Sequence, residues 1–263
     1  MKKFLVLVVV AMVLFTAAGC SKSAKGSGGS DTIVFGTSAD YPPFEFHILD
    51  DGVDKIVGID VSLAYQIAAD MGKTLQIADM NFDNLLTLMA KGDCDFVIAA
   101  IEQTPERIKQ ASCSDPYFTD QPPMVLVKKG NEGLYKSLDD FAGKTVGAQS
   151  ATTMSETVSD EMEGAIPLFM ASVVDLINNL VYDKCDALLL DGSVALQYAA
   201  VNADLAIADV DIGEALPYCV WVAKDDPKGL LKSINATIAK VLSDGSMERF
   251  IEEAEELSSQ ALD

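Results

Sequence analysis

The sequence predicts an α/β fold of two similar lobes, each a β-sheet covered by helices. Three observations lead to this prediction. Short apolar strands alternate with amphipathic helices, one helix–turn–strand plan occurs twice, and the tail returns to helix. Alternating strands and helices imply a parallel sheet with helices on its faces.

The first unit begins with a β-rich run at 32–36 that ends in glycine and predicts a buried strand. Apolar residues at helical spacing follow over 60–71, and Gly72 ends that pattern. A second helix is predicted from Asp83 to Gly92, after which the chain returns as a strand over 96–100.

The second unit repeats this plan. Residues 85–98 can be laid on residues 176–189 without a gap, and each stretch contains a helix, a turn, a Cys-Asp pair and a buried strand. The run 144–148 supplies the opening strand. Any two helix-to-strand passages share some of these features, so a chance likeness is the alternative. We expect two similar lobes.

The tail predicts two helices, one from Pro227 through Val241 and one from Met247 through Ala254. We expect them to pack on the first lobe, which makes that lobe discontinuous. Lobe 1 then comprises residues 31–120 plus 217–263, and lobe 2 comprises 121–216. The chain would cross between the lobes twice, near 118–124 and 213–219, and two crossings form a hinge that permits closure around a ligand.

The N-terminus carries an export pattern. Two lysines and an apolar run at 4–15, too short to span a bilayer, predict a signal peptide over 1–19. The motif AAGC at 17–20 resembles a bacterial lipobox, which implies that Cys20 becomes the lipidated N-terminus. The small residues up to 30 predict a flexible linker. An ordinary signal peptide with an incidental cysteine is the alternative. The predicted location is extracytoplasmic, anchored to the cell membrane through the lipid on Cys20.

Charge and cysteine usage exclude several classes of function. The chain has 40 acidic and 19 basic residues and a net charge of -21, which disfavours nucleic acid as a partner. The body cysteines, Cys94, Cys113, Cys185 and Cys219, form no CxxC pattern, and His47 is the one histidine. This argues against a zinc site and against Cys/His catalysis. We expect buried free thiols and no cofactor.

The sharpest local signal is the stretch 102–107, which follows the strand ending at Ala100. Thr104 is a good N-cap and Pro105 suits the first helical position. Free N–H groups and the Arg107 guanidinium would then bind a carboxylate at the carboxyl end of the sheet. The alternative is a surface helix whose arginine pairs with a neighbouring acid.

The matching edge of the second unit carries Asp191, directly after the strand 187–190. A carboxylate there could hold an ammonium group while Arg107, across the cleft, holds a carboxylate. Together they fit the head group of an α-amino acid. The alternative is that Asp191 caps the following helix. Thr152 and Thr153 follow the strand at Val146, where they could cap a helix whose N–H groups face the cleft.

The motif YPPFEF at 41–46 follows the first strand. Paired prolines fix the backbone and project aromatic side chains, which suits a wall against the ligand. The alternative is packing of these aromatics into the core of the lobe, which we expect for some of them.

These motifs occur in a fixed order that resembles a known family. The ordered set comprises 41–46, 58–61, 104–107, 114–118, 146–149, 185–187 and Asp191. It resembles the polar amino acid binding proteins of bacterial ABC importers, the group that holds glutamine- and histidine-binding proteins. The resemblance covers the chain from Asp31 to its end.

The resemblance implies a two-lobed periplasmic-binding-protein type II fold with two hinge strands. It implies that Arg107 binds the ligand's α-carboxylate and Asp191 its ammonium group, and that Tyr41 stacks on the side chain opposite Phe82. The predicted ligand-binding residues are Tyr41, Phe82, Ala100, Glu102, Arg107, Gln149, Thr152, Thr153 and Asp191.

Departures from the family pattern bear on specificity. Glu102 stands where relatives usually carry a small hydroxyl residue, and Ala151 replaces a usual glycine. Glu102 and Asp191 against Arg107 leave the pocket with a net negative charge, and an unpaired buried charge costs about 3–5 kcal/mol. We therefore expect a polar or cationic L-amino acid as ligand. The alternative is that Glu102 points to solvent or contacts only the ammonium group.

The predicted function is that of a monomeric solute-binding lipoprotein that delivers an amino acid to the membrane subunits of an ABC importer. ATP would be spent by the importer. A cyclohexadienyl dehydratase-like enzyme on the same fold is the alternative, with Glu102 as the acid or base. Against an enzyme stand the single histidine and the lack of an evident nucleophile or metal set. A sensory module is the third possibility, with its membrane and signalling parts on a partner.

Overall fold

The computed structural model describes residues 31–261, within a compact unit that begins at Asp31. The predicted signal peptide (1–19), the lipidation site Cys20 and the linker (20–30) lie outside the described residues. Among the described residues, no helix is long and apolar enough to cross a membrane.

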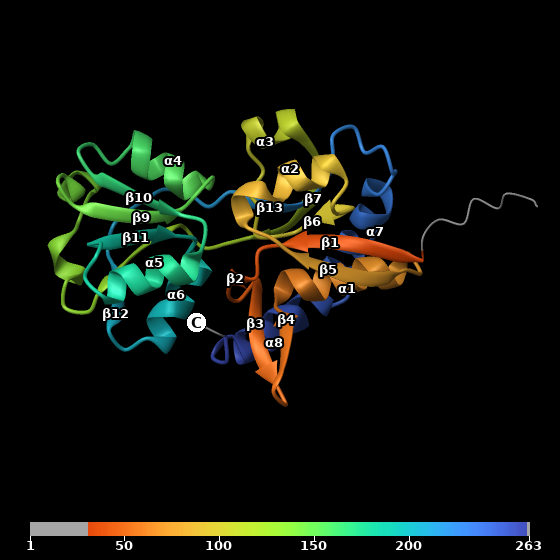
Figure 1. Cartoon of the computed structure of the whole chain (residues 1–263), viewed down its shortest axis with the longest axis horizontal. Coiled ribbons are helices and arrows are strands. Elements are labelled where there is room, and N and C mark those ends of the chain that lie inside the picture. Colours follow the sequence, from red (N-terminus) through yellow and green to blue (C-terminus); the bar gives the residue numbers. More distant parts are fainter. Residues whose placement is uncertain (1–30, 262–263) are drawn as a thin grey trace, which may run out of the picture. The chain divides into compact units, whose positions relative to one another are not determined.

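The first lobe is built on a five-stranded sheet (Figure 1). Its strand order is β5 (Thr74–Asp79), β1 (Thr32–Thr37), β6 (Phe96–Val97), β13 (Pro217–Ala223), β7 (Ala111–Thr119). A separate three-stranded sheet contains β2 (Asp40–Tyr41), β3 (Glu45–Asp50) and β4 (Val53–Val57). The helices of this lobe are α1 (Ile59–Asp70), α2 (Leu85–Lys91), α3 (Pro105–Gln110), α7 (Leu231–Ser243) and α8 (Ser246–Ser258).

The second lobe is built on another five-stranded sheet. Its strand order is β10 (Ile166–Met170), β9 (Thr145–Gln149), β11 (Ala187–Leu190), β8 (Met124–Lys128), β12 (Leu205–Ala208). The α-helices are α4 (Thr153–Asp160), α5 (Val173–Val181) and α6 (Gly192–Val201). The predicted two-lobed α/β architecture is therefore confirmed.

Each sheet is mixed rather than wholly parallel. In the first, β13 runs antiparallel to β6 and β7; in the second, β8 runs antiparallel to β11 and β12. Each reversed strand is the first one that the chain forms after passing from the other sheet, at 120–123 and at 209–216. The residue limits predicted for the lobes stay a prediction.

The repeat predicted from the sequence extends to individual hydrogen bonds. Asp95 accepts the Val34 N–H at 2.7 Å through its side chain, and Asp186 accepts the Thr145 N–H at 2.8 Å in the same way. The backbone N–H groups of both aspartates also donate to these two partner residues, at 2.8 Å. Each Cys-Asp pair therefore ties its returning strand to the strand that opens its lobe, which a chance likeness would not explain.

Several element boundaries differ from the prediction. The strand predicted over 96–100 is assigned only at β6, and Ala100 lies in the left-handed region with φ 47°. The second helix is preceded by a 3₁₀ turn, Phe82–Asn84. Of the four body cysteines, Cys94, Cys185 and Cys219 are buried free thiols as expected, whereas Cys113 is half-buried.

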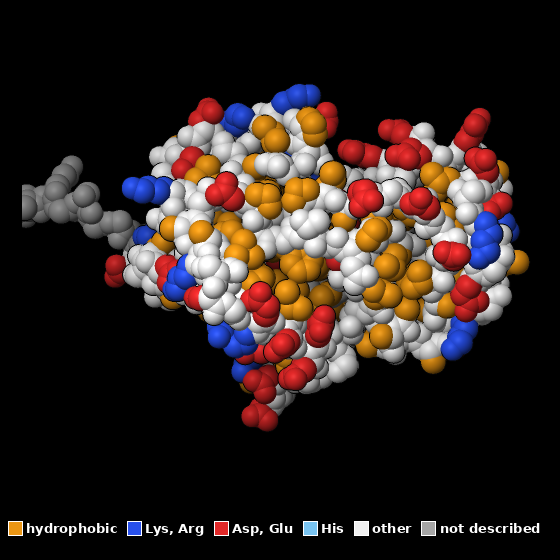
Figure 2. Space-filling model, turned by 180° about the vertical axis from the view of Figure 1, so that it is seen from behind, with side chains coloured by type: hydrophobic (Ala, Val, Ile, Leu, Met, Phe, Trp, Pro, Cys, Tyr) orange, Lys and Arg blue, Asp and Glu red, His pale blue; other side chains and the backbone are white. Residues whose placement is uncertain are grey.

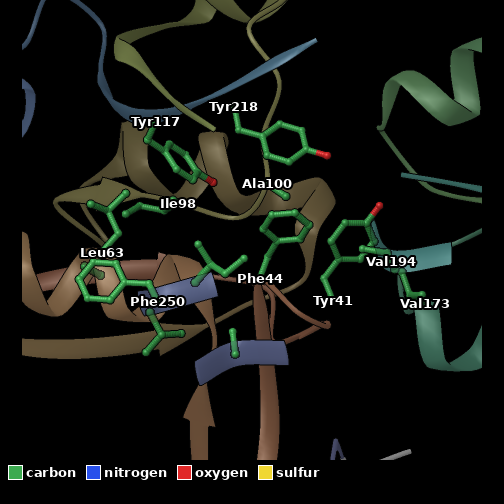
Figure 3. Close-up of a cluster of buried hydrophobic side chains, with 14 of the residues drawn as sticks. Tyr41, Phe44, Leu63, Ile98, Ala100, Tyr117, Val173, Val194, Tyr218 and Phe250 are labelled. Atoms are coloured by element: carbon green, nitrogen blue, oxygen red, sulfur yellow. The ribbon is translucent and has the colours of Figure 1, made fainter. Parts of the chain in front are cut away.

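The loop that carries Tyr41 is fixed by the start of α1. The N–H groups of Ile59 and Asp60 donate to the carbonyl oxygens of Pro43 and Phe44 at 3.1 and 3.0 Å. Gly58 has φ 131°, and a Cβ there would lie 2.1 Å from the Phe44 carbonyl oxygen, so only glycine fits. Figure 3 shows Tyr41 and Phe44 in one cluster with Tyr218.

Candidate functional site

Arg107 is positioned by the start of α3. The Thr104 hydroxyl oxygen accepts the Arg107 backbone N–H at 3.2 Å, and Pro105 occupies the first helical position, as the sequence predicts. The Arg107 residue is 9% exposed. The other residues of α3 are exposed, and Arg107 pairs with a neighbouring acid, so the alternative describes the helix itself correctly, but the arginine points inward instead of to the surface.

That acid is Glu102. One guanidinium nitrogen, Nη1, donates to Glu102 Oε2 at 2.8 Å and to the Glu102 carbonyl oxygen at 3.0 Å. The other, Nη2, donates to the Ala151 carbonyl oxygen of the second lobe at 3.2 Å. The guanidinium carbon also lies 5.9 Å from the centroid of the Phe82 ring. Arg107 thus reaches from the first lobe to the second and lies against the predicted aromatic wall.

Glu102 lies between the two lobes. It is 5% exposed, and its second carboxylate oxygen, Oε1, accepts the hydroxyl of Thr153, the first residue of α4. The alternative in which Glu102 points to solvent is therefore wrong. Both carboxylate oxygens have protein partners, one from each lobe.

The loop between β9 and α4 of the second lobe contributes mainly backbone groups to the site, because several of its side chains are used in local hydrogen bonds. Thr152 caps α4 by accepting the Ser155 N–H at 3.1 Å, and its hydroxyl donates to the Gln149 carbonyl at 2.6 Å. The Gln149 side chain donates to the Ala171 carbonyl at 3.0 Å. Ala151 adopts φ 64°, a conformation that favours glycine and turns its carbonyl toward Arg107.

Asp191 is the N-cap residue of α6, but its side chain makes no capping hydrogen bond, so capping does not occupy its carboxylate. Its carboxylate accepts the Tyr41 hydroxyl at 2.7 Å, which joins the two lobes a second time. Burial raises the pKa of Asp191 well above its usual range, and the charge of Glu102 raises it further. Asp191 is therefore a buried acid close to a second acid, and a cation would stabilise it.

Asp120 is a residue that the sequence reasoning missed. It lies on the segment 120–123 between the lobes, and its carboxylate accepts the Ser193 N–H at 3.1 Å and the Tyr218 hydroxyl at 3.3 Å. Its charge contributes to raising the pKa of Asp191. In Figure 3 the Tyr218 and Tyr41 hydroxyls lie on the side of the aromatic cluster nearest Val194. The one feature of the sequence that could have identified Asp120 as a site residue is its position directly after the strand β7.

Comparisons with known proteins identify the family of the chain. A model of the bacterial extracellular solute-binding proteins, family 3, matches residues 33–254. The chain belongs to this family. The predicted resemblance to amino acid binding proteins of ABC importers is confirmed, and so is the predicted function as a solute-binding protein of that class.

Several similar proteins are named for arginine. The arginine-binding extracellular protein ArtP of Bacillus subtilis is 34% identical over 256 residues, which cover 95% of this chain and 96% of ArtP. An amino acid ABC transporter substrate-binding protein, AbpA of Streptococcus pneumoniae, solved bound to L-arginine, has a TM-score of 0.84 and 32% identity. That match covers 88% of this chain and 97% of AbpA. The L-cystine-binding protein TcyJ of Escherichia coli is 30% identical and covers 84% of this chain and 81% of TcyJ.

In this solute-binding protein, the backbone of Ala100 is held by Asp60, one of a second pair of acids. The Ala100 N–H donates to Asp60 Oδ2 at 2.8 Å, and the Tyr117 hydroxyl donates to Asp60 Oδ1 at 2.7 Å. Burial raises the pKa of Asp60 to about 6, and it raises that of Glu45 well above the usual range, with the charge of Asp60 as a further cause. Asp60 therefore fixes the backbone of Ala100, two residues before Glu102.

Among the described residues, three cavities of the solute-binding protein are lined from both lobes. One, of about 210 Å³, lies beside Phe82, Arg107 and Thr153, and another, of about 280 Å³, lies beside Asp40 and Ser172. The third, of about 240 Å³, lies beside Pro42 and Tyr198. Among residues 31–261, no group of three or more His, Cys, Asp or Glu side chains could hold a metal ion. Figure 2 shows acidic side chains spread over the visible face, consistent with the negative net charge.

Proposed function

We propose that the protein is the extracytoplasmic receptor of an amino acid ABC importer and that it binds a cationic L-amino acid between its lobes. L-arginine is the first candidate. The observation that carries this proposal is that a buried guanidinium from α3 and a buried carboxyl from the start of α6 each form a hydrogen bond with the opposite lobe. Opposite charges on opposite lobes suit a zwitterionic head group.

Arg107 and the Thr153 hydroxyl would bind the ligand's α-carboxylate. An arginine side chain offers two parallel N–H donors to a carboxylate, and such charge-assisted bonds are about twice as strong as neutral ones. Thr153 adds a donor from the second lobe. Binding by groups from both lobes stabilises the closed arrangement, which an importer can recognise.

Asp191 would bind the ligand's ammonium group, with the Tyr41 hydroxyl as its second donor. The raised pKa of Asp191 reflects burial without a compensating positive charge. An ammonium group supplies that charge and would restore the ionised form. Proton release on binding is an expected consequence.

A second positive charge on the ligand is favoured by the acids of the cleft. Glu102, Asp191 and Asp120 carry three carboxyls, and Arg107 is the one cation in contact with them among the described residues. A cationic side chain reduces this excess of negative charge, whereas a neutral zwitterion leaves it unchanged. The arginine-bound structure of AbpA supports the same class of ligand.

Attachment to the membrane through a lipid on Cys20, after removal of residues 1–19, fits a receptor of this class. We also propose that the protein acts as a monomer and catalyses no reaction. Glu102, the acid that an enzyme on this fold would use, is bound by Arg107 and Thr153. This supports a structural role for Glu102 over proton transfer.

A thermal-shift screen of the purified protein against the twenty amino acids tests the proposal. A ligand present at a hundred times its Kd stabilises the folded state by about 2.7 kcal/mol. We expect arginine, and to a lesser degree lysine, to raise Tm most, with calorimetry giving the Kd. A response to neutral amino acids alone would contradict the cationic ligand, and no response at all would contradict the receptor function.

A further inference from the structure

The Glu102 carboxylate makes the contacts that a ligand's α-carboxylate would make. Oε2 lies 2.8 Å from Arg107 Nη1, and Oε1 accepts the Thr153 hydroxyl. These are the two donors, one from each lobe, that the proposed function assigns to the ligand. A chain with a small hydroxyl residue at position 102 could not bridge them in this way.

We propose that Glu102 is a specificity-determining residue, an internal carboxylate that occupies Arg107 and Thr153 until a ligand with two positive charges displaces it. The inference rests on the proposed function and deepens it. It assigns to this chain a way of rejecting neutral amino acids that depends on the charge of the ligand's side chain and not on its size or shape.

Displacement is required because the donors are limited. Arg107 already directs Nη1 to Glu102 and Nη2 to the Ala151 carbonyl. A second carboxylate arriving at the same guanidinium would lie next to that of Glu102, and like charges at short range repel. The ligand's carboxylate can therefore bind well only when the Glu102 side chain turns away.

The displaced carboxylate stays near Arg107, because the backbone of Glu102 is fixed. The Glu102 backbone bridges to Tyr218, and the N–H of Gln103 donates to the Pro217 carbonyl at 2.9 Å. Only the side chain is free to rotate, within a site where the residue is 5% exposed. Asp191 lies close enough for its pKa to respond to the charge of Glu102. Rotation toward Asp191 thus brings two acids together and provides no relief.

Cationic and neutral amino acids differ in how many of the buried acids they can pair with. A cationic amino acid brings one carboxylate for Arg107 and two positive groups, one for Asp191 and one for Glu102. A neutral amino acid brings one carboxylate but only one positive group, its ammonium. Either Asp191 or Glu102 then stays buried without a positive partner. An unpaired buried charge is strongly unfavourable. The penalty falls on neutral ligands whatever their size or shape.

L-arginine and L-citrulline make a matched pair of probes, because citrulline replaces the guanidinium by a neutral group of similar shape. Calorimetry with wild-type protein, Glu102→Gln and Glu102→Thr measures the ratio of the two affinities. We expect wild-type protein to prefer arginine by about a hundredfold or more and both variants to lower that ratio at least about tenfold, mainly by tighter citrulline binding. Glu248→Gln, an exposed acid on α8, is the control and should keep the wild-type ratio.

Two results would overturn the inference. One is an unchanged arginine-to-citrulline ratio in both folded variants, as checked by circular dichroism; arginine binding by wild-type protein would then leave the proposed function intact. The other is a crystal structure of the arginine complex in which Glu102 still contacts Arg107. Failure of wild-type protein to bind any amino acid would instead refute the proposed function, and this inference with it.

Discussion

Two clusters of buried acids lie close together in the first lobe and behave differently. The cleft acid Glu102 has a guanidinium partner in Arg107 at 2.8 Å. The inner acid pair, Glu45 and Asp60, is fully buried, and the donors to Asp60 are a tyrosine hydroxyl and a backbone N–H, with no cation in contact among the described residues. The comparison teaches that the partner decides the role of a buried acid. One beside a cation can exchange that partner for a ligand, and one without a cation keeps a proton and serves the fold.

The two clusters are coupled through the backbone. Asp60 binds the N–H of Ala100, whose left-handed conformation directs the chain toward Glu102. A left-handed alanine costs about 1–2 kcal/mol. The inner acid pair offsets that cost and so holds the segment from which both Glu102 and Arg107 project. Its contribution to binding is therefore indirect.

Removing the cation should give the largest effect. Arg107→Ala takes away the proposed carboxylate site and leaves Glu102 buried without a partner. We expect arginine binding to weaken by more than about a hundredfold in calorimetry and the free energy of unfolding to fall by about 3–5 kcal/mol. Arg249→Ala, which breaks an exposed pair with Glu253, is the control and should cost less than about 1 kcal/mol. If Arg107→Ala binds arginine within tenfold of the wild-type affinity, then the cation beside Glu102 does not give that acid a role in binding, and the proposed difference between the two clusters is wrong.

The inner acid pair should instead respond to pH. The pKa of Asp60 is raised to about 6 and that of Glu45 is raised further from its usual range, so the folded state binds protons more tightly than the unfolded chain. The resulting stability is fully present below about pH 4 and is lost as pH rises through about 6. Asp60 alone contributes about 3 kcal/mol to this loss, since each pH unit of difference in pKa corresponds to about 1.4 kcal/mol.

Glu45→Gln isolates that contribution from other titrating groups. The variant keeps a donor for Asp60 but removes one acid, so it should gain stability relative to wild type by about 1–3 kcal/mol between pH 4 and 8 in urea unfolding. Glu248→Gln changes an exposed acid on α8 and should run parallel to wild type. If the Glu45→Gln and wild-type curves are also parallel, then the inner pair holds no shared proton.

Much of the cleft was predictable from the sequence because its parts are local. Thr104 and Pro105 predict the start of α3, and Arg107 follows within one turn. Asp191 follows a run of apolar residues that could only be a buried strand. The carboxyl ends of strands from two similar units were expected to face one site. Local patterns of this kind depend on few tertiary contacts.

The pairings were not predictable, since they depend on how distant segments meet. Asp60 reads as an ordinary acid at a helix start, and nothing in the sequence shows that Glu45 on β3 lies close to it. Glu102 was identified as unusual, but its bridge to Thr153 depends on the approach of the second lobe. The partner of a buried acid is a property of the fold, and that partner determines its chemistry.

Asp40 provides the smallest and most discriminating test, because it is a half-buried acid with a third kind of partner. It lies on β2, and its carboxylate accepts the N–H of Val173, the first residue of α5 in the second lobe, at 2.7 Å. Burial raises the pKa of Asp40 to about 6, and the Val173 N–H opposes that rise. A helix N-terminus carries a partial positive charge, so Asp40 should act as a weak electrostatic link between the lobes.

Asp40→Asn should therefore weaken arginine binding by about fivefold, which corresponds to about 1 kcal/mol, without loss of folding. The control is Asp175→Asn, an exposed acid in the first turn of α5 that belongs to the same lobe as that helix. Below pH 6 Asp40 becomes protonated, so the difference in affinity between wild type and Asp40→Asn should shrink. Equal effects of the two substitutions at pH 7 would mean that the charge of Asp40 does not act between the lobes. A partial charge would then be too weak a partner to give a buried acid a role in closure.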